Sequence, residues 1–331
     1  MKRTLIAVIA LAALVAAGCG GSSDTKDGES SGNSNAKTKL ALVAYSTPQV
    51  VYDELIPAFT KTPEGADIGF STSFGASGDQ SRAVEAGQKA DVVSFSIEPD
   101  VTRLVKAGLV GEDWKSGPTK GLVSTSFVSF IVRKGNPKNI RTWADLLKPG
   151  VKVLTPNPFT SGAAKWNLLA AYGQAGSGAA GLDYVGKLIK DHVVVQDKSG
   201  REALQNFTSG TGDVLLSYEY EAITAQKKGE KVDFVVPDKT IKIEIDIATT
   251  KDAPPAAKTF VDYVLSKAGQ ETFAEWGYRS VNPAVKNPPE PDDVFTIADL
   301  GGWTKVNDEL FDPEKGSIAE IEKDAGVSTS K

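Results

Sequence analysis

Four serines stand at places where a strand is expected to give way to a helix. Each follows an apolar segment and precedes an amphipathic one, and the four are Ser46, Ser77, Ser161 and Ser199. Three of them also have the spacing of a capping box, completed by Gln49, Gln80 and Glu202. A helix N-terminus presents unpaired backbone N–H groups and the positive end of the helix dipole, and a serine hydroxyl adds one more donor. Together these groups predict a site for a small, fully ionised oxyanion.

The stretch 155–173 carries the clearest of these helix starts. Two prolines exclude both a strand ladder and a helix, so the chain must turn after a short apolar run. Ser161 then occupies the expected N-cap position, and Gly162 and Ala163 leave the helix start nearly bare. Because nothing bulky covers the N–H groups there, we expect them to form one wall of the anion pocket.

The composition argues against several other kinds of site. The chain has one cysteine, Cys19, and one histidine, His192, so neither a Cys/His zinc site nor a Ser-His-Asp triad is expected. A formal net charge of −5 without a basic stripe argues against a nucleic-acid partner. We expect a binding protein without cofactor or metal. An extracellular hydrolase of sulfate or phosphate esters is the alternative from another class, supported only by the anion site.

Apolar strands alternate with amphipathic helices through most of the chain. We predict strands at 40–45, 68–74, 91–97, 125–133, 151–154, 192–196, 213–217 and 233–237. Continuous apolar strands of this kind belong to a mainly parallel sheet covered on both faces, which makes the fold class α/β. In such folds ligands bind at the carboxyl ends of the strands, where the serines lie. A half-exposed strand that returns to the first domain is predicted by the alternation of Ile241, Ile243, Ile245 and Ile247.

Residues 1–18 have the pattern of an export signal. Two basic residues precede an apolar stretch that is too short to span a bilayer. Its end, 15–19, resembles the bacterial lipoprotein cleavage motif, in which the cysteine is lipidated and becomes the mature N-terminus. Residues 19–38 predict a flexible tether. We therefore expect an exported protein, lipid-anchored through Cys19 to the outer face of the cytoplasmic membrane. The alternative is an ordinary secretory signal, which would give a periplasmic protein.

Several motifs resemble the sulfate-binding proteins of bacterial ABC importers. They occur in one order at 74–80, 132–138, 145–151, 155–167, 212–215, 219–222 and 295–303. The resemblance implies a two-domain, hinged periplasmic-binding-protein fold of the second type, with domain I formed by 39–124 plus 241–331 and domain II by 125–240. It also implies a monomer that holds one dehydrated anion between its domains and docks on the permease subunits of an ABC transporter.

The anion contacts of that family correspond to Ser46, Ser77, Ser161, Gly162, Ala163, Gly200 and Tyr218. The resemblance implies donation to sulfate, or to thiosulfate, by serine hydroxyls and by backbone N–H groups. It also implies that Arg201 orients the Gly200 loop rather than touching the anion. Ser46 stands where the family commonly has aspartate. Tyr218 stands where it commonly has tryptophan, and its hydroxyl can supply the same kind of donor. Both residues are similar to those of molybdate-binding proteins, so molybdate or tungstate is the alternative cargo.

Overall fold

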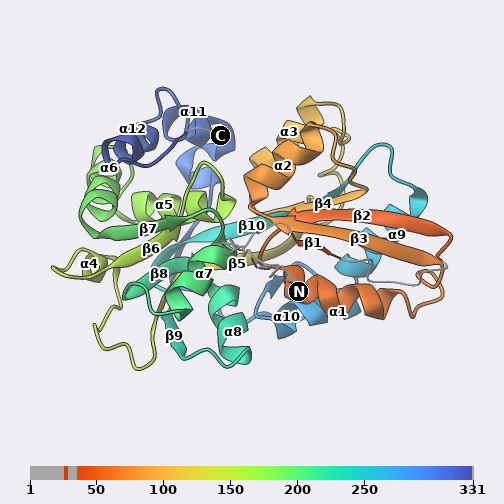
Figure 1. Cartoon of the computed structure of the whole chain (residues 1–331), viewed down its shortest axis with the longest axis horizontal. Coiled ribbons are helices and arrows are strands. Elements are labelled where there is room, and N and C mark those ends of the chain that lie inside the picture. Colours follow the sequence, from red (N-terminus) through yellow and green to blue (C-terminus); the bar gives the residue numbers. More distant parts are fainter. Residues whose placement is uncertain (1–25, 29–35, 330–331) are drawn as a thin grey trace, which may run out of the picture.

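The computed structural model describes residues 26–28 and 36–329. The predicted signal peptide, Cys19 and most of the predicted tether lie outside these residues. The described chain forms two α/β lobes whose strands follow one path, β1-β3-β2-β4-β10-β5-β8-β6-β7 (Figure 1). Within the predicted tether, β1 (Lys26–Gly28) pairs antiparallel with β3. Among the residues described, no helix has both the length and the apolar character needed to cross a membrane.

The first lobe is built on a strand that is buried on both faces. β2 (Thr38–Tyr45) runs parallel to both β3 (Ile68–Gly75) and β4 (Val92–Phe95). Alternate side chains point to opposite faces, so Leu42 joins the main core while Val43 packs under the helices on the other face. One face is covered by α1 (Gln49–Phe59), α9 (Pro255–Leu265) and α10 (Lys267–Glu275), and the other by α2 (Ser77–Glu85) and α3 (Glu98–Lys106).

The second lobe repeats this arrangement. Its parallel strands are β7 (Val193–Asp197), β6 (Val153–Pro156) and β8 (Val214–Tyr218), with β6 in the middle. One face is covered by α5 (Gly162–Gln174) and α6 (Gly178–Lys187), and the other by α7 (Gly200–Thr208) and α8 (Glu219–Lys227). The remaining helical segments are the short α4 (Trp143–Leu146) and a π-helical turn at Leu188–His192.

Two long central strands join the lobes. β5 (Leu122–Arg133) pairs antiparallel with β10 (Lys239–Thr249) over its first half, and with β8 and β9 (Val232–Val235) over its second. β10 also pairs antiparallel with β4 of the first lobe. The predicted strand of alternating isoleucines is present, and all four isoleucines are buried. Its half-exposed character holds at Lys242 and Glu244, which are partly exposed, but not at Asp246, which is buried where β10 pairs with β4.

A buried ion pair fastens the junction between the lobes. Arg279, in β11 (Arg279–Ser280), donates to both carboxylate oxygens of Glu219 at 2.7 and 3.1 Å. The two side chains are only 4% and 10% exposed. The same guanidinium lies over the Phe127 ring of β5 and donates to the carbonyls of Pro288 and Pro289. One side chain therefore links β5, α8 and the segment that leads toward the C-terminus.

The last part of the described chain packs on the second lobe. It runs through β12 (Asp293–Phe295) and a 3₁₀ turn at Ala298–Leu300 to α11 (Gly302–Glu309) and α12 (Ser317–Asp324), which lie beside α5 and α6 (Figure 1). The Trp303 ring meets the Trp166 ring of α5 edge-on, with centroids 4.8 Å apart. Gln196 of β7 donates to Glu322 at 2.7 Å. These contacts place this segment against elements of the predicted domain II, although the division predicted from the sequence puts all of 241–331 in domain I.

Candidate functional site

The strand ends of the two lobes meet where the lobes touch. Ser46 follows β2 and Ser77 follows β3, both in the first lobe. In the second lobe, Ser161 precedes α5, Gly200 begins α7, and Tyr218 ends β8. All five residues are buried. Contacts between the lobes place these positions, with Gly162 and Ala163 next to Ser161, along a common boundary, which we call the seam: Gly162 lies against Ser96, which is hydrogen-bonded to Ser77, and Arg201, beside Gly200, donates to the Ser46 carbonyl.

Hydrogen bonds cross the seam directly. The Gly78 N–H of α2 donates to the Thr160 carbonyl at 3.2 Å. Trp166 of α5 donates from its indole N–H to the Ser96 carbonyl, beyond β4, at 2.6 Å. In each pair one residue comes from each lobe, so this structure has the two lobes closed on each other.

The start of α5 lies at the position that the sequence predicts. Ser161 is the N-cap residue in an extended conformation, but its side chain makes no capping hydrogen bond. Gly162 approaches the first lobe so closely that a Cβ atom there would lie 2.2 Å from the Ser96 hydroxyl oxygen. The helix start thus abuts the first lobe with no side chain between them.

Two of the three predicted capping boxes are wrong. α1 begins only at Gln49 with Pro48 as its N-cap, so Ser46 lies outside the helix. Ser77 is the first helical residue of α2 rather than its cap. Ser199 does cap α7, where its hydroxyl accepts a hydrogen bond from the Glu202 N–H at 3.2 Å. Ser46 and Ser77 therefore reach the seam without capping the helices that follow them.

Ser77 has a buried partner that the sequence does not indicate. Its hydroxyl donates to Asp100 Oδ2 at 2.6 Å and accepts from the Ser96 N–H at 3.1 Å. Asp100 is only 3% exposed. Burial raises the pKa of this carboxyl, against the opposing effects of the Ser77 hydrogen bond and of nearby cations. The direction of the Ser77 hydroxyl is thus tied to a titratable group.

Two buried hydroxyls at the seam, those of Tyr218 and Ser96, have no hydrogen-bond partner among the residues that the structure describes. Burial raises the pKa of Tyr218 well above its usual value, so the phenol stays protonated and able to donate. Ser96 is near enough to act on that pKa in the opposite direction, but the two hydroxyls do not have hydrogen-bond geometry. A buried, unsatisfied hydroxyl costs about 1–3 kcal/mol, so an acceptor placed between these groups would be stabilised.

Arg201 ties the start of α7 to the first lobe. Its guanidinium donates to the Ser46 carbonyl and to the Gln49 side chain. Beside it, a Cβ added at Gly200 would lie 3.4 Å from Glu221 Oε2. Burial raises the pKa of Glu221 to about 7, so its negative charge near the seam is reduced at neutral pH.

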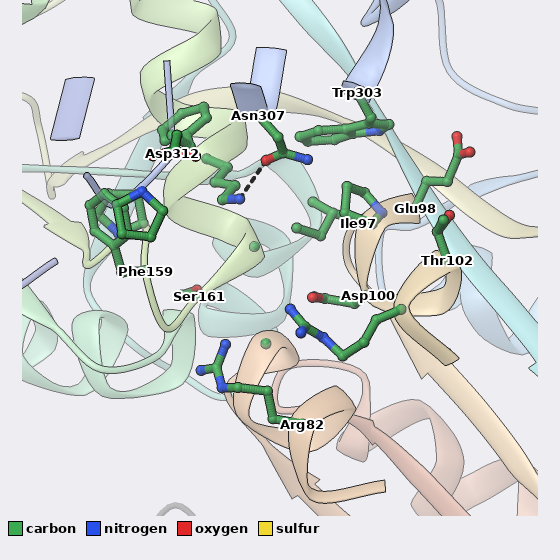
Figure 2. A pocket seen from close by; sticks show the side chains of 18 of the residues that line it. Arg82, Ile97, Glu98, Asp100, Thr102, Phe159, Ser161, Trp303, Asn307 and Asp312 are labelled. Atoms are coloured by element: carbon green, nitrogen blue, oxygen red, sulfur yellow. Dashed lines mark hydrogen bonds between the residues drawn. The ribbon is translucent and has the colours of Figure 1, made fainter. Parts of the chain in front are cut away.

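A cavity of about 400 Å³ borders the start of α5 (Figure 2). Asp100 and Arg82 lie on its first-lobe side, Ser161 lies on its second-lobe side, and Trp303 and Asn307 of α11 lie along another edge. Its lining mixes acidic and basic side chains. In the part of the chain that the structure describes, no group of three or more His, Cys, Asp or Glu residues could hold a metal ion.

Residues 40–279 match the family model described as bacterial extracellular solute-binding protein. The chain belongs to this family. The sulfate-binding protein of Synechococcus elongatus is 38% identical to this chain, and the match covers 94% of each chain. The thiosulfate-binding protein of Pseudomonas aeruginosa is 33% identical, over 85% of this chain and 91% of its own. The molybdate-binding protein ModA of Mycobacterium bovis is 23% identical over 84% of this chain and 97% of its own.

A solved structure is similar over the same range. The sulfate-binding protein SubI from Mycobacterium tuberculosis is 46% identical, covers 83% of this solute-binding protein and all of its own chain, and superposes with a TM-score of 0.80. The predicted periplasmic-binding-protein fold of the second type is thereby confirmed.

Sequence patterns alone missed three residues of the seam in this solute-binding protein. Ser96 follows β4 as the other serines follow their strands, so the same pattern would have found it. The spacing around Trp166 indicated only that it lies on one face of a helix, not that it contacts the other lobe. Asp100 reaches Ser77 from 23 positions away through the packing of α3 on α2, for which no local pattern exists.

Proposed function

We propose that this protein captures sulfate, and also thiosulfate, at the seam and delivers it to the permease of an ABC transporter. The observation that carries the proposal is the pair of buried, unpartnered hydroxyls of Tyr218 and Ser96 beside the bare start of α5. The sulfate- and thiosulfate-binding relatives support the choice of anion.

The chemistry of the proposed site suits a dianion. A buried anion is stable only when its oxygens are saturated with hydrogen bonds. We assign donation to the hydroxyls of Ser46, Ser77, Ser161 and Tyr218, to the N–H groups of Gly162, Ala163 and Gly200, and to the unpartnered Ser96 hydroxyl that the sequence did not indicate. These donors are neutral and come from both lobes, so a bound anion stabilises the closed state by its higher affinity for it.

Molybdate or tungstate is the second candidate cargo. Ser46 and Tyr218 favour it, because both depart from the residues common in sulfate-binding proteins. The molybdate-binding relative is the more distant one, at 23% identity, so sulfate is the main proposal.

A calorimetric titration tests the cargo. Purified protein comprising residues 20–331 is titrated with sulfate, and the saturated sample is then titrated with molybdate. We expect tight sulfate binding that molybdate does not displace. Displacement by molybdate would transfer the assignment to the second cargo, and a folded protein that binds neither anion would end the proposal.

Ser161→Ala tests the assignment of the α5 start. Loss of one hydrogen bond to a charged group should weaken sulfate binding by about 1–3 kcal/mol. Wild-type affinity in this variant would remove Ser161 from the site.

We further propose a monomeric receptor without catalytic activity, anchored through acylated Cys19. Replacing Cys19 by Ser should move the protein from the membrane fraction to the soluble fraction. Absence of turnover on generic sulfate and phosphate esters would support a role in binding alone. The contacts of α11 and α12 also lead us to propose that this C-terminal segment moves with the second lobe.

A further inference from the structure

A tyrosine of the second lobe is enclosed by groups of the first. Tyr220 lies in the first turn of α8 and is only 1% exposed. Its hydroxyl oxygen lies 3.0 Å from the Tyr45 hydroxyl, at the end of β2, and 2.7 Å from Thr47 Oγ1, between β2 and α1. Tyr45 and Thr47 belong to the first lobe, so two hydrogen bonds cross the seam at this one side chain.

The ring of Tyr220 is also held by the first lobe. It stacks on the Tyr278 ring, with centroids 3.7 Å apart and planes only 13° from parallel. Tyr278 directly precedes β11, and its ring meets the Phe273 ring of α10 edge-on, with centroids 5.2 Å apart. Tyr45, Thr47 and Tyr278 therefore form a socket on the first lobe, and the Tyr220 side chain fills it.

The hydroxyls in this socket suit one another chemically. Each has one proton and two lone pairs, so Tyr220 can donate to one first-lobe hydroxyl while it accepts from the other. Burial raises the pKa of Tyr45 and of Tyr220, so both phenols stay protonated at neutral pH. Because the bonded groups are neutral, this link between the lobes should not depend on pH near neutrality.

The socket lies beside the proposed anion site without belonging to it. A Cβ added at Gly200 would lie 3.5 Å from Thr47 Cγ2, and the Tyr218 and Tyr220 rings meet edge-on with centroids 5.3 Å apart. Gly200 and Tyr218 are proposed anion donors, whereas the Tyr220 hydroxyl is already engaged by Tyr45 and Thr47. Tyr220 is therefore placed to act on closure of the lobes and not on the anion itself.

The two ends of the Tyr220 side chain should respond differently when the lobes rotate. The start of α8 is fastened to the junction, because the neighbouring Glu219 is paired with Arg279 of β11. The hydroxyl lies at the far end of the ring, at the seam, where rotation about the junction produces a larger displacement. A rotation that leaves the aromatic stack nearly intact can therefore break the hydroxyl contacts.

We propose that the Tyr220 hydroxyl, bonded to Tyr45 and Thr47, is a latch that holds the lobes closed and so sets how long a bound sulfate is retained. This inference rests on the proposed function. Tyr220 acts as a positioning residue, since it contacts the first lobe and not the anion. Because the latch forms on closure, its loss should speed the release of sulfate and leave the first encounter of sulfate with the open protein unchanged.

Tyr220→Phe tests the latch, since it removes the hydroxyl and keeps the aromatic stack. Release is measured by chasing bound radiolabelled sulfate with excess unlabelled sulfate, and association by stopped-flow tryptophan fluorescence, because Trp166 donates across the seam. The loss of two hydrogen bonds between neutral groups predicts release about 5- to 150-fold faster, with an unchanged association rate. Unchanged release, or slower association with unchanged release, would overturn the inference.

Thr47→Val tests the partner of the latch, because it removes the hydroxyl and nearly preserves the shape of the side chain. We expect faster release in this variant as well. In the double variant with Tyr220→Phe, release should be slower than the product of the two single effects predicts, because residues that share a hydrogen bond are energetically coupled. Effects that simply multiply would show that Tyr220 and Thr47 act independently and would overturn the latch.

Tyr52→Phe is the matched control. The Tyr52 hydroxyl is buried in the first lobe and has no hydrogen-bond partner in the part of the chain that the structure describes. We expect this variant to release sulfate at the wild-type rate. Release accelerated as much as in Tyr220→Phe would mean that the loss of any buried tyrosine hydroxyl has this effect, which would overturn the inference. Absence of sulfate binding by the folded wild type would instead refute the proposed function.

Discussion

Replacing Gly162 by alanine tests whether function requires the close contact between the start of α5 and the first lobe. Gly162 belongs to the second lobe, and its nearest neighbours, Ser96 and Ile97, belong to the first. An added Cβ would lie 2.2 Å from Ser96 Oγ and 3.1 Å from Ile97 Cγ2. Real Cβ atoms essentially never approach a neighbour within 3.0 Å. Rotation of the Ser96 hydroxyl relieves the shorter contact, but the lobes must still separate by a few tenths of an ångström to relieve the contact with Ile97.

The strain should appear in binding rather than in folding. Overpacking by a methyl group costs about 1–3 kcal/mol. Here the clash exists only between two lobes that can move apart, so it penalises closure and leaves the core of each lobe intact. That penalty corresponds to sulfate binding weakened about 5- to 150-fold. Within α5 itself, alanine is a better helix former than glycine, so thermal stability should be unchanged or slightly higher.

The assay is a sulfate titration of the wild type, of Gly162→Ala and of a matched variant, Gly186→Ala. Gly186 lies in α6, where an added Cβ would meet only Ile321 Cδ1 at 3.9 Å, an ordinary contact. We expect wild-type affinity for the Gly186 variant and weakened binding for the Gly162 variant alone. Wild-type affinity in Gly162→Ala would refute the idea that the seam closes around this helix start.

Three further predictions concern buried polar groups. Arg279→Ala should lower the unfolding free energy by about 3–5 kcal/mol, because Glu219 becomes an unpaired buried charge. A urea titration measures this, and a loss below about 1 kcal/mol would contradict the prediction. Burial raises the pKa of Glu221 to about 7, so the folded protein holds this proton more tightly than the unfolded chain does. The unfolding free energy should therefore fall as pH rises toward about 7, and Glu221→Gln should flatten this fall between about pH 5 and about pH 8. Tyr218→Phe should weaken sulfate binding about 10- to 150-fold. Thermal stability should not fall, because the Tyr218 hydroxyl has no hydrogen-bond partner among the residues that this structure describes, and a large drop in the melting temperature would instead indicate a structural role.

The sequence predicted the architecture well because the architecture is recorded in local patterns. Burial selects apolar residues at regular positions, so the continuous apolar strands and the alternating isoleucines of β10 can be recognised from the spacing of hydrophobic residues in the sequence. The bare start of α5 was predictable for the same reason, since proline, serine and small residues act on the backbone next to them.

The details of the seam were less predictable because they depend on contacts across the fold. The capping box at Ser46 failed because Pro48 delays the start of α1, and the one at Ser77 failed because Ala76 takes the capping position. The pairing of Ser77 with Asp100 follows from the packing of two helices, which no spacing in the sequence encodes.

The two central strands that join the lobes also determine how the molecule can deform. β5 and β10 cross together and hydrogen-bond to each other in a fixed register, from Phe127 opposite Lys242 to Ser124 opposite Ile245. This ribbon, with the short β11 paired beside β5, resists stretching and sliding, because both would break its ladders, but it bends and twists more easily. Opening should therefore change the angle between the lobes while the distance along the ribbon stays nearly constant. The junction therefore acts as a bending hinge. The distance between two spectroscopic labels on the outer helices of the two lobes should change when the lobes open, whereas the distance between two labels placed along the ribbon should hardly change.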